Sequence, residues 1–142
     1  MGLDTFATGL SHEDNFHGSY GRYSAFIEEL INHVYGTKCR EIFRRGRCDG
    51  FCDGKYIGPL TEEDMSIWNS QSNDDLNILI CHPDDRGQFS PDECRKIYNA
   101  IKDIQFDLDT TTYSGKSVCE TLEKFKKIFR HCARRRVNLY YR

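Results

Sequence analysis

The chain has 142 residues, a formal net charge of −2 and a hydrophobic content of 38%. This length suits one domain with a continuous core, so we expect a single domain over residues 1–142. The slightly negative charge excludes strong overall attraction to a polyanion, and no run approaches the roughly 20 apolar residues of a membrane span. Seven cysteines, an odd number spread along the chain, indicate reduced thiols and a cytoplasmic protein without membrane contact.

The N-terminal part of the chain predicts a strand, a loop and a core helix. Residues 2–7 form the expected strand, in which Asp4 is an unusual residue, and a polar, glycine-rich loop follows over residues 8–21. From Tyr23 to Val34, apolar residues recur at three- and four-residue steps, as on the buried face of a helix. Gly36 stands where a left-handed residue would end that helix.

The middle of the chain gives weaker signals. Residues 37–58 are irregular, with a tight hairpin expected at Asp53-Gly54. Thr61 can cap a short helix that anchors Trp68 in the core. The mostly apolar run Asn77–Ile80 predicts a central strand that is covered on both faces.

The C-terminal part predicts two helices and a last strand. Ser90 and Glu93 form a capping box for the first helix, and Ser117 begins a longer one that ends at Arg136. Residues 137–141 alternate as in a strand, and we expect this strand beside the N-terminal one. The predicted fold class is α+β, with a small sheet of about three strands packed against three main helices.

The turn before Ser90 partly matches a calcium loop. With Gly87 at the tight turn of an EF-hand, His82, Asp84 and Glu93 take the first, third and last ligand positions. Calcium prefers oxygen ligands, but this loop offers an imidazole first and the guanidinium of Arg86 fifth. The alternative is an ordered turn with negative charge near a helix N-terminus and no metal.

A zinc site is the second metal hypothesis. Four soft ligands are available from His33, Cys39, Cys48 and Cys52. Only Cys48 and Cys52 have the paired spacing that is typical of zinc knuckles. The alternative is a set of small buried thiols, so we expect no cofactor and keep calcium and zinc as alternatives.

Four segments carry a resemblance to known proteins. They are the opening residues 1–4 (MGLD), the segment 16–21 (FHGSYG), the turn 82–87 (HPDDRG) that leads to residues 90–94 (SPDEC), and residues 135–141 (RRVNLYY). Together they resemble small uncharacterised proteins that are encoded by bacteriophages and prophages. Similar proteins often have H-S-D-C-D-G at the turn, from which this chain departs. The resemblance implies a phage origin and the bacterial host cytoplasm, but no catalytic residues.

Short accessory phage proteins commonly act by binding, and this is the function that the resemblance implies. We expect a non-enzymatic binding protein that interferes with a host process such as defence. It would sequester a small anionic, nucleotide-type ligand or block a host protein. Arginines can hold phosphates while a tyrosine stacks on a base. The candidate ligand-binding residues are His17, Tyr20, Arg44, Arg45, Arg130, Arg134, Arg135 and Tyr140.

Other functions remain open at this stage. Acidic residues between the basic clusters argue against double-stranded DNA as a partner. A metal-dependent hydrolase for a nucleotide or phosphodiester would require a set of ligands from distant parts of the chain to converge. This set is Asp4, His17, His82, Asp84 and Glu93. A third possibility is a virion structural or assembly subunit, and the sequence also leaves a homo-oligomer open.

Overall fold

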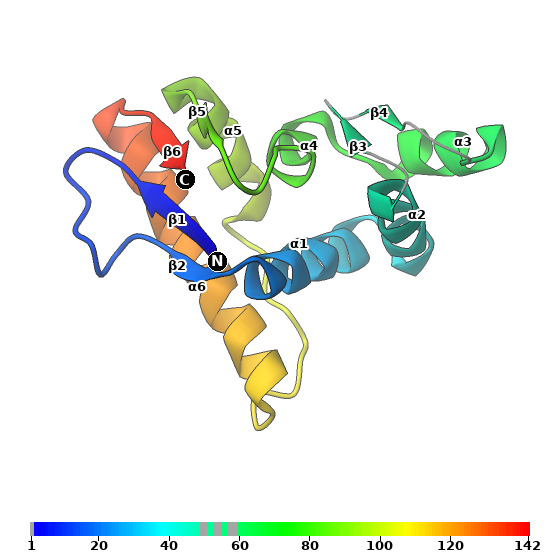
Figure 1. Ribbon diagram of the computed structural model, residues 1–142, viewed down its shortest axis with the longest axis horizontal. Coiled ribbons are helices and arrows are strands. Elements are labelled where there is room, and N and C mark those ends of the chain that lie inside the picture. The colour runs from blue at the N-terminus through cyan, green and yellow to red at the C-terminus, as the bar shows by residue number, and fades with distance from the viewer. Residues whose placement is uncertain (1, 49–50, 53–54, 57–59) are drawn as a thin grey trace. The chain divides into compact units, whose positions relative to one another are not determined.

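The structure is a computed structural model that describes residues 2–48, 51–52, 55–56 and 60–142, without the side chains of residues 47, 48, 51, 52, 55 and 56. Over these residues the chain forms six helices, a four-stranded antiparallel sheet and a two-stranded ribbon (Figure 1), so the α+β fold class is confirmed. Contacts divide the chain into a first unit, Met1–Phe26 with Pro83–Arg142, and a second unit, Ile27–His82. The single domain expected from the chain length stays a prediction.

The four-stranded sheet belongs to the first unit, and its strands lie in the order β2-β1-β6-β5. The bounds are Gly2–Phe6 for β1, His17–Ser19 for β2, Gly87–Phe89 for β5 and Leu139–Tyr141 for β6. Asp4 on β1 pairs with His17, and Phe6 pairs with Tyr140. The predicted pairing of the N-terminal and C-terminal strands is therefore confirmed. Alternation along β1 buries Leu3 and exposes Asp4 and Phe6 on the other face of the sheet.

The long helix α6 (Tyr113–Arg135) packs against the buried face of this sheet (Figure 1), where Phe129 meets Phe89 edge-on at 5.5 Å between ring centroids. Phe125 stacks on Phe26 with ring centroids 5.1 Å apart. The spacing of Val118, Leu122, Phe125, Phe129 and Cys132 predicts one apolar stripe along this helix, and the stripe is confirmed as its buried side. Its buried members are Val118, Thr121, Leu122, Phe125, Ile128, Phe129 and Cys132.

The start of α6 differs from the expectation, whereas its end agrees. Thr112 is the N-cap, and its Oγ1 accepts a hydrogen bond from the backbone N–H of Gly115 at 3.1 Å. The expected start at Ser117 was wrong, because a Ser-x-x-Glu pattern also fits the interior of a helix when an earlier residue caps it. Arg136 adopts the left-handed conformation (φ 57°, ψ 47°) and ends the helix as predicted.

Helix α5 (Pro91–Ile101) begins as predicted. Ser90 Oγ accepts from the N–H of Glu93 at 3.1 Å, and Glu93 Oε1 accepts from the N–H of Ser90 at 2.9 Å. The helix buries Cys94 and Ile97 and packs beside α6. The capping box therefore fixes the start of α5, the helix that packs beside α6 in the first unit.

The predicted central strand Asn77–Ile80 was wrong. These residues lie in helix α4 (Asp74–Ile80), whose N-cap is Asn73. The Asn73 side chain accepts from the N–H of Leu76 at 3.0 Å, and the helix buries Leu76, Leu79 and Ile80. A short apolar run has no periodicity that distinguishes a buried strand from a buried helix. Here the N-cap Asn73 favours the helix.

The second unit contains most of α1 (Tyr20–Val34), α2 (Thr37–Cys48), α3 (Glu62–Gln71) and α4. Gly36 has φ 101° and ends α1 as predicted. Residues 37–48 are helical, although the irregular signals of this segment did not predict a helix there. Trp68 is buried and stacks on Phe43 at 6.3 Å. Strands β3 (Phe51–Cys52) and β4 (Lys55–Tyr56) pair as in a hairpin, whereas the turn residues Asp53 and Gly54 lie outside the described residues.

Candidate functional site

The C-terminal half of α6 carries what we call the cationic face. Lys127, Arg130, His131, Arg134 and Arg135 line a surface depression of about 710 Å³. Their spacing of three and four residues places them on the side of the helix opposite its buried stripe. Three candidate ligand-binding arginines are therefore brought together. Lys127 and His131 were not among the candidates, although they continue the same spacing.

Carboxylates of the described residues do not balance the charges of the cationic face. Its lysine and three arginines are exposed, and they make no ion pair within the described part of the chain. A helix C-terminus favours cations, but this effect is confined to the last turn. The helix dipole therefore accounts for the positions of Arg134 and Arg135 in the last turn. Lys127 and Arg130 lie one to two turns earlier, so the helix dipole does not explain the whole cluster.

A second depression lies on the exposed face of the sheet, and we call it the sheet pocket. Its volume is about 440 Å³. It is lined by Asp4, Thr5, Phe6, Leu10, His12, Asn15, His17 and Arg142. Only His17 was a candidate ligand-binding residue. The strand alternation that exposes Asp4 also exposes Phe6, and this is the signal that could have identified Phe6.

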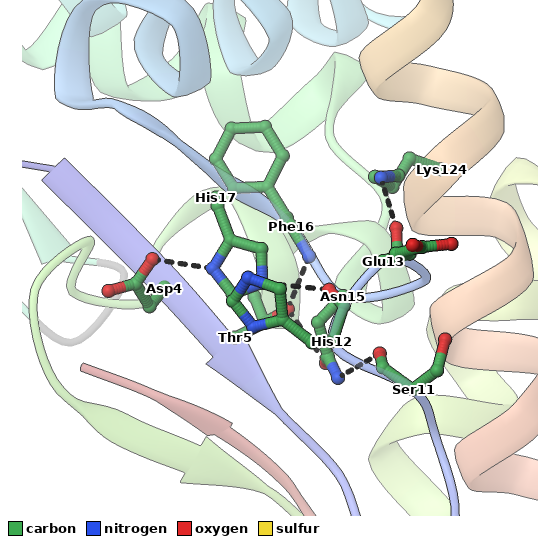
Figure 2. A network of polar contacts seen from close by, with 9 residues as sticks. All are labelled: Asp4, Thr5, Ser11, His12, Glu13, Asn15, Phe16, His17 and Lys124. Atoms are coloured by element: carbon green, nitrogen blue, oxygen red, sulfur yellow. Dashed lines mark hydrogen bonds and ion pairs between the residues drawn. The ribbon is translucent and has the colours of Figure 1, made fainter.

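His17 is held by acceptors at both ring nitrogens (Figure 2). Nδ1 lies 2.7 Å from Asp4 Oδ1, and Nε2 lies 2.9 Å from the carbonyl oxygen of His12. Both facing atoms are oxygen acceptors, so a ring nitrogen of His17 that carries a proton has a partner. His17 would have to leave these partners before it could bind a metal.

The loop that carries His12 is fixed at several points. Thr5 Oγ1 donates to Asn15 Oδ1 at 3.0 Å, and Lys124 Nζ donates to the carbonyl oxygen of Glu13 at 2.7 Å (Figure 2). The ring of His12 stacks on His17 at 3.9 Å between centroids. No hydrogen bond from a described residue reaches the His12 ring. The pocket is thus preformed, with one imidazole available to a ligand.

Phe6 of the sheet pocket lies beside a second exposed aromatic side chain, Tyr140. Phe6 is 41% exposed and Tyr140 is 38% exposed, with ring centroids 6.3 Å apart. The Arg142 guanidinium lies 4.9 Å from the centroid of the Phe6 ring. Tyr141 cannot stack on a ligand here, because it is buried and its hydroxyl bonds that of Tyr23 at 2.8 Å.

The remaining candidate ligand-binding residues line neither depression. In the second unit, Arg44 pairs with Glu28, and Arg45 makes a bidentate ion pair with Asp64 at 2.8 and 2.9 Å. Tyr20 is half-buried at the first position of α1. A ligand would have to displace a carboxylate from either arginine. Ligand binding by these three residues stays a prediction.

The two metal hypotheses concern His33, Cys39, Cys48 and Cys52 for zinc, and His82, Asp84 and Glu93 for calcium. Among the described residues, no group of three or more His, Cys, Asp or Glu side chains is arranged to hold a metal ion. Cys39 is fully buried and His33 is exposed, while the side chains of Cys48 and Cys52 lie outside the description. Glu93 is engaged in its capping box. Zinc and calcium binding therefore stay predictions.

The pKa values of two cysteine thiols indicate whether these residues can act as nucleophiles. Burial raises the pKa of the Cys81 thiol to about 12, and it also raises the pKa of Cys39. A thiol acts as a nucleophile or metal ligand only as the thiolate. Both thiols stay protonated at neutral pH, which is typical of structural cysteines.

The chain matches no protein-family model, no curated protein and no solved structure. Within the described residues, no helix is long and apolar enough to cross a membrane. The function has to be inferred from the two depressions of the first unit.

Proposed function

We propose that the protein is a non-enzymatic binding protein that holds a small anionic ligand of nucleotide type on the cationic face. The observation that carries this proposal is the depression formed by four exposed cations and His131 on successive turns of one helix. The whole chain has a formal charge of −2, so this positive charge is local. Guanidinium groups bind phosphate oxygens through paired, charge-assisted hydrogen bonds.

The size and charge of the region favour a small ligand over duplex DNA. Duplex binding draws on many phosphate contacts along an extended basic surface. Here four cations and His131 line one depression of about 710 Å³, within the roughly 300–1,000 Å³ that is usual for small-molecule sites. The resemblance to phage proteins supports a setting in the host cytoplasm. Sequestering such a ligand would interfere with a host process such as defence.

The hydrolase alternative receives less support. It requires Asp4 and His17 to supply catalytic or metal-binding groups, and the two residues do lie together. However, both nitrogens of His17 already face an oxygen acceptor within hydrogen-bond distance, and Asp4 Oδ1 is one of these acceptors. A binding function uses the exposed groups as they are, whereas hydrolysis would first require this network to open.

Titration calorimetry with tripolyphosphate as the probe tests the proposal. The variant Arg130→Gln with Arg134→Gln removes two charges from the depression. Hydrogen bonds to charged groups contribute about 1.5–3 kcal/mol each, so we expect at least a ~100-fold loss of affinity. The matched control is Arg95→Gln with Lys96→Gln, an exposed adjacent pair on α5.

We expect the control to bind like the wild type, and both variants to keep the wild-type melting temperature within a few degrees. The proposal fails if the wild-type protein does not bind tripolyphosphate at physiological salt. It also fails if the control pair reduces binding as much as the α6 pair, because the attraction would then be diffuse.

A further inference from the structure

We propose that the sheet pocket is a second, separate site, which binds a free α-amino acid with a large apolar side chain. The carboxylate of this ligand binds Arg142, its ammonium group binds Asp4, and its side chain covers Phe6. None of these residues lines the depression of the cationic face, so this site does not depend on the proposed function. Its ligand is a zwitterion, whereas the cationic face is proposed to bind an anion.

Asp4 on β1 and Arg142, directly after β6, stand opposite each other. The N–H of Asp4 donates to the carbonyl oxygen of Arg142 at 2.7 Å, and the N–H of Arg142 donates to the carbonyl oxygen of Asp4 at 2.9 Å. Residues that exchange both backbone hydrogen bonds have Cα atoms about 5.5 Å apart, and their side chains lie on the same face of the sheet. Both residues line the sheet pocket. The pocket therefore presents a carboxylate and a guanidinium from adjacent positions.

These two opposite charges are engaged with other neighbours. An ion pair directly across two strands is stabilising, yet none joins Asp4 and Arg142 in the described part of the chain. Asp4 Oδ1 instead lies 2.7 Å from Nδ1 of His17 (Figure 2). The Arg142 guanidinium lies 4.9 Å from the centroid of the Phe6 ring. A ligand with one group of each charge can therefore bind both residues without first breaking an ion pair between them.

Both charged groups can form further hydrogen bonds. The Asp4 side chain is 61% exposed, and no hydrogen bond from a described residue reaches its Oδ2. Arg142 is exposed, and its guanidinium makes no hydrogen bond to the described residues. A guanidinium binds a carboxylate through two parallel hydrogen bonds, and a carboxylate accepts from an ammonium group. An α-amino acid carries both groups on one carbon atom, with the nitrogen and the carboxyl carbon about 2.5 Å apart, so it can contact Asp4 and Arg142 at once.

The apolar lining of the pocket suits a large apolar side chain. Phe6 is 41% exposed, and Leu10 is half-buried. The ring of Phe6 also adjoins that of Tyr140, with centroids 6.3 Å apart. Covering such surface favours binding roughly in proportion to the apolar area removed from water. The volume of about 440 Å³ is in the lower part of the roughly 300–1,000 Å³ range of small-molecule sites, as expected for a ligand of amino-acid size.

The loop that borders the pocket is held by a buried network (Figure 2). Asn15 is buried, donates to the carbonyl oxygen of Ser11 at 3.0 Å, and accepts from Thr5. The N–H of Phe16 donates to Thr5 Oγ1 at 2.8 Å. The pocket is therefore formed before a ligand arrives, so little ordering accompanies binding.

Calorimetry on the wild-type protein with four probes tests the ligand class. L-Phenylalanine carries all three groups, N-acetyl-L-phenylalanine lacks the ammonium group, L-phenylalaninamide lacks the carboxylate, and glycine lacks the side chain. Hydrogen bonds between charged groups are the strong ones, so we expect each of the last three probes to bind at least ~10-fold more weakly than L-phenylalanine. This comparison does not depend on the folding of any variant.

Two variants test which residue binds which group. Arg142→Gln should weaken the binding of L-phenylalanine about 10- to 100-fold, and it should no longer distinguish L-phenylalanine from L-phenylalaninamide. Asp4→Asn should weaken it by a similar factor and no longer distinguish L-phenylalanine from the N-acetyl derivative. Arg130→Gln with Arg134→Gln is the matched control on the cationic face, and it should bind L-phenylalanine like the wild type.

The contrary outcomes are distinct from a failure of the proposed function. The site is refuted if L-phenylalanine does not bind at millimolar concentration, or if the α6 control pair weakens its binding as much as Arg142→Gln does. Equal binding of L-phenylalanine and either blocked derivative would refute recognition of a zwitterion, and equal binding of glycine would refute the apolar contact. Tripolyphosphate binding should be the same in Arg142→Gln as in the wild type, so the anion site is tested separately.

Discussion

The buried hydroxyl pair between Tyr23 and Tyr141 allows a sharp test of the first unit. The two oxygens are 2.8 Å apart, the rings meet edge-on at 5.7 Å, and both side chains are 3% exposed. Burial raises the pKa of both hydroxyls well above the ordinary value, so both are neutral at pH 7. One hydroxyl therefore donates to the other, and the pair joins α1 to β6.

Tyr141→Phe removes one oxygen and leaves the Tyr23 hydroxyl buried without this partner. An unsatisfied buried polar group costs about 1–3 kcal/mol, so we expect the free energy of unfolding to fall by about 2 kcal/mol. Replacing both residues, Tyr23→Phe with Tyr141→Phe, removes both polar atoms and keeps the rings. The double variant should therefore regain at least half of the loss.

Urea unfolding followed by far-ultraviolet circular dichroism measures both effects. Fluorescence would be a poor probe, because the one tryptophan, Trp68, belongs to the second unit. With a slope of about 1–3 kcal/mol per molar urea, the single substitution should lower the midpoint by roughly 1 M. A double variant that is less stable than Tyr141→Phe would refute the reasoning, because the cost would then not come from an unpaired hydroxyl.

Two further predictions concern local stability. Arg136→Gly should raise the free energy of unfolding by about 0.5–1 kcal/mol, because glycine adopts the left-handed conformation of Arg136 without strain. Arg136→Ala is the control in urea unfolding, and an equal gain there would contradict the explanation. The Arg45 guanidinium, followed by the N–H of Thr61, lowers the pKa of Asp64 to about 2. The carboxylate therefore stabilises the folded state above the unfolded pKa of about 3.9, and this contribution is lost as the pH falls towards 2. The difference in melting temperature between wild type and Asp64→Asn should shrink over that range, and a constant difference would exclude the ion pair as its cause.

The parts of the fold that the sequence predicted are those with local signals. The capping box at Ser90 and the stripe on α6 depend on residues within a few positions of one another. The left-handed end at Gly36 and the end of α6 at Arg136 are local as well. Such features form in nearly the same way whatever surrounds them, so they could be predicted without the structure.

The wrong predictions concern segments whose secondary structure depends on residues outside the segment itself. Asn77–Ile80 is equally apolar as a strand or a helix, and Asn73 determines the outcome. Strand β2 has only three residues, and it forms because Asp4 and His17 come opposite each other. Its periodicity is too short to be recognised in the sequence.

The candidate site also has one region that local spacing predicts and one that depends on the fold. The arginines of the cationic face follow a helical spacing, so their grouping could be predicted. The sheet pocket joins β1, β2, the loop between them and Arg142 after β6, and their meeting depends on the pairing register. A register cannot be determined from the sequence of one strand, because it depends on the partner strand as well. His12 and Phe6 were therefore not identified as site residues.

Native mass spectrometry of the protein purified from the cells that express it tests the central claim most directly. The account predicts that the wild-type protein retains a nucleotide-sized mass and that the variant Arg130→Gln with Arg134→Gln lacks it. A bare wild-type protein, or a bound mass that is equally present in the variant, would contradict the assignment of the cationic face as the ligand site.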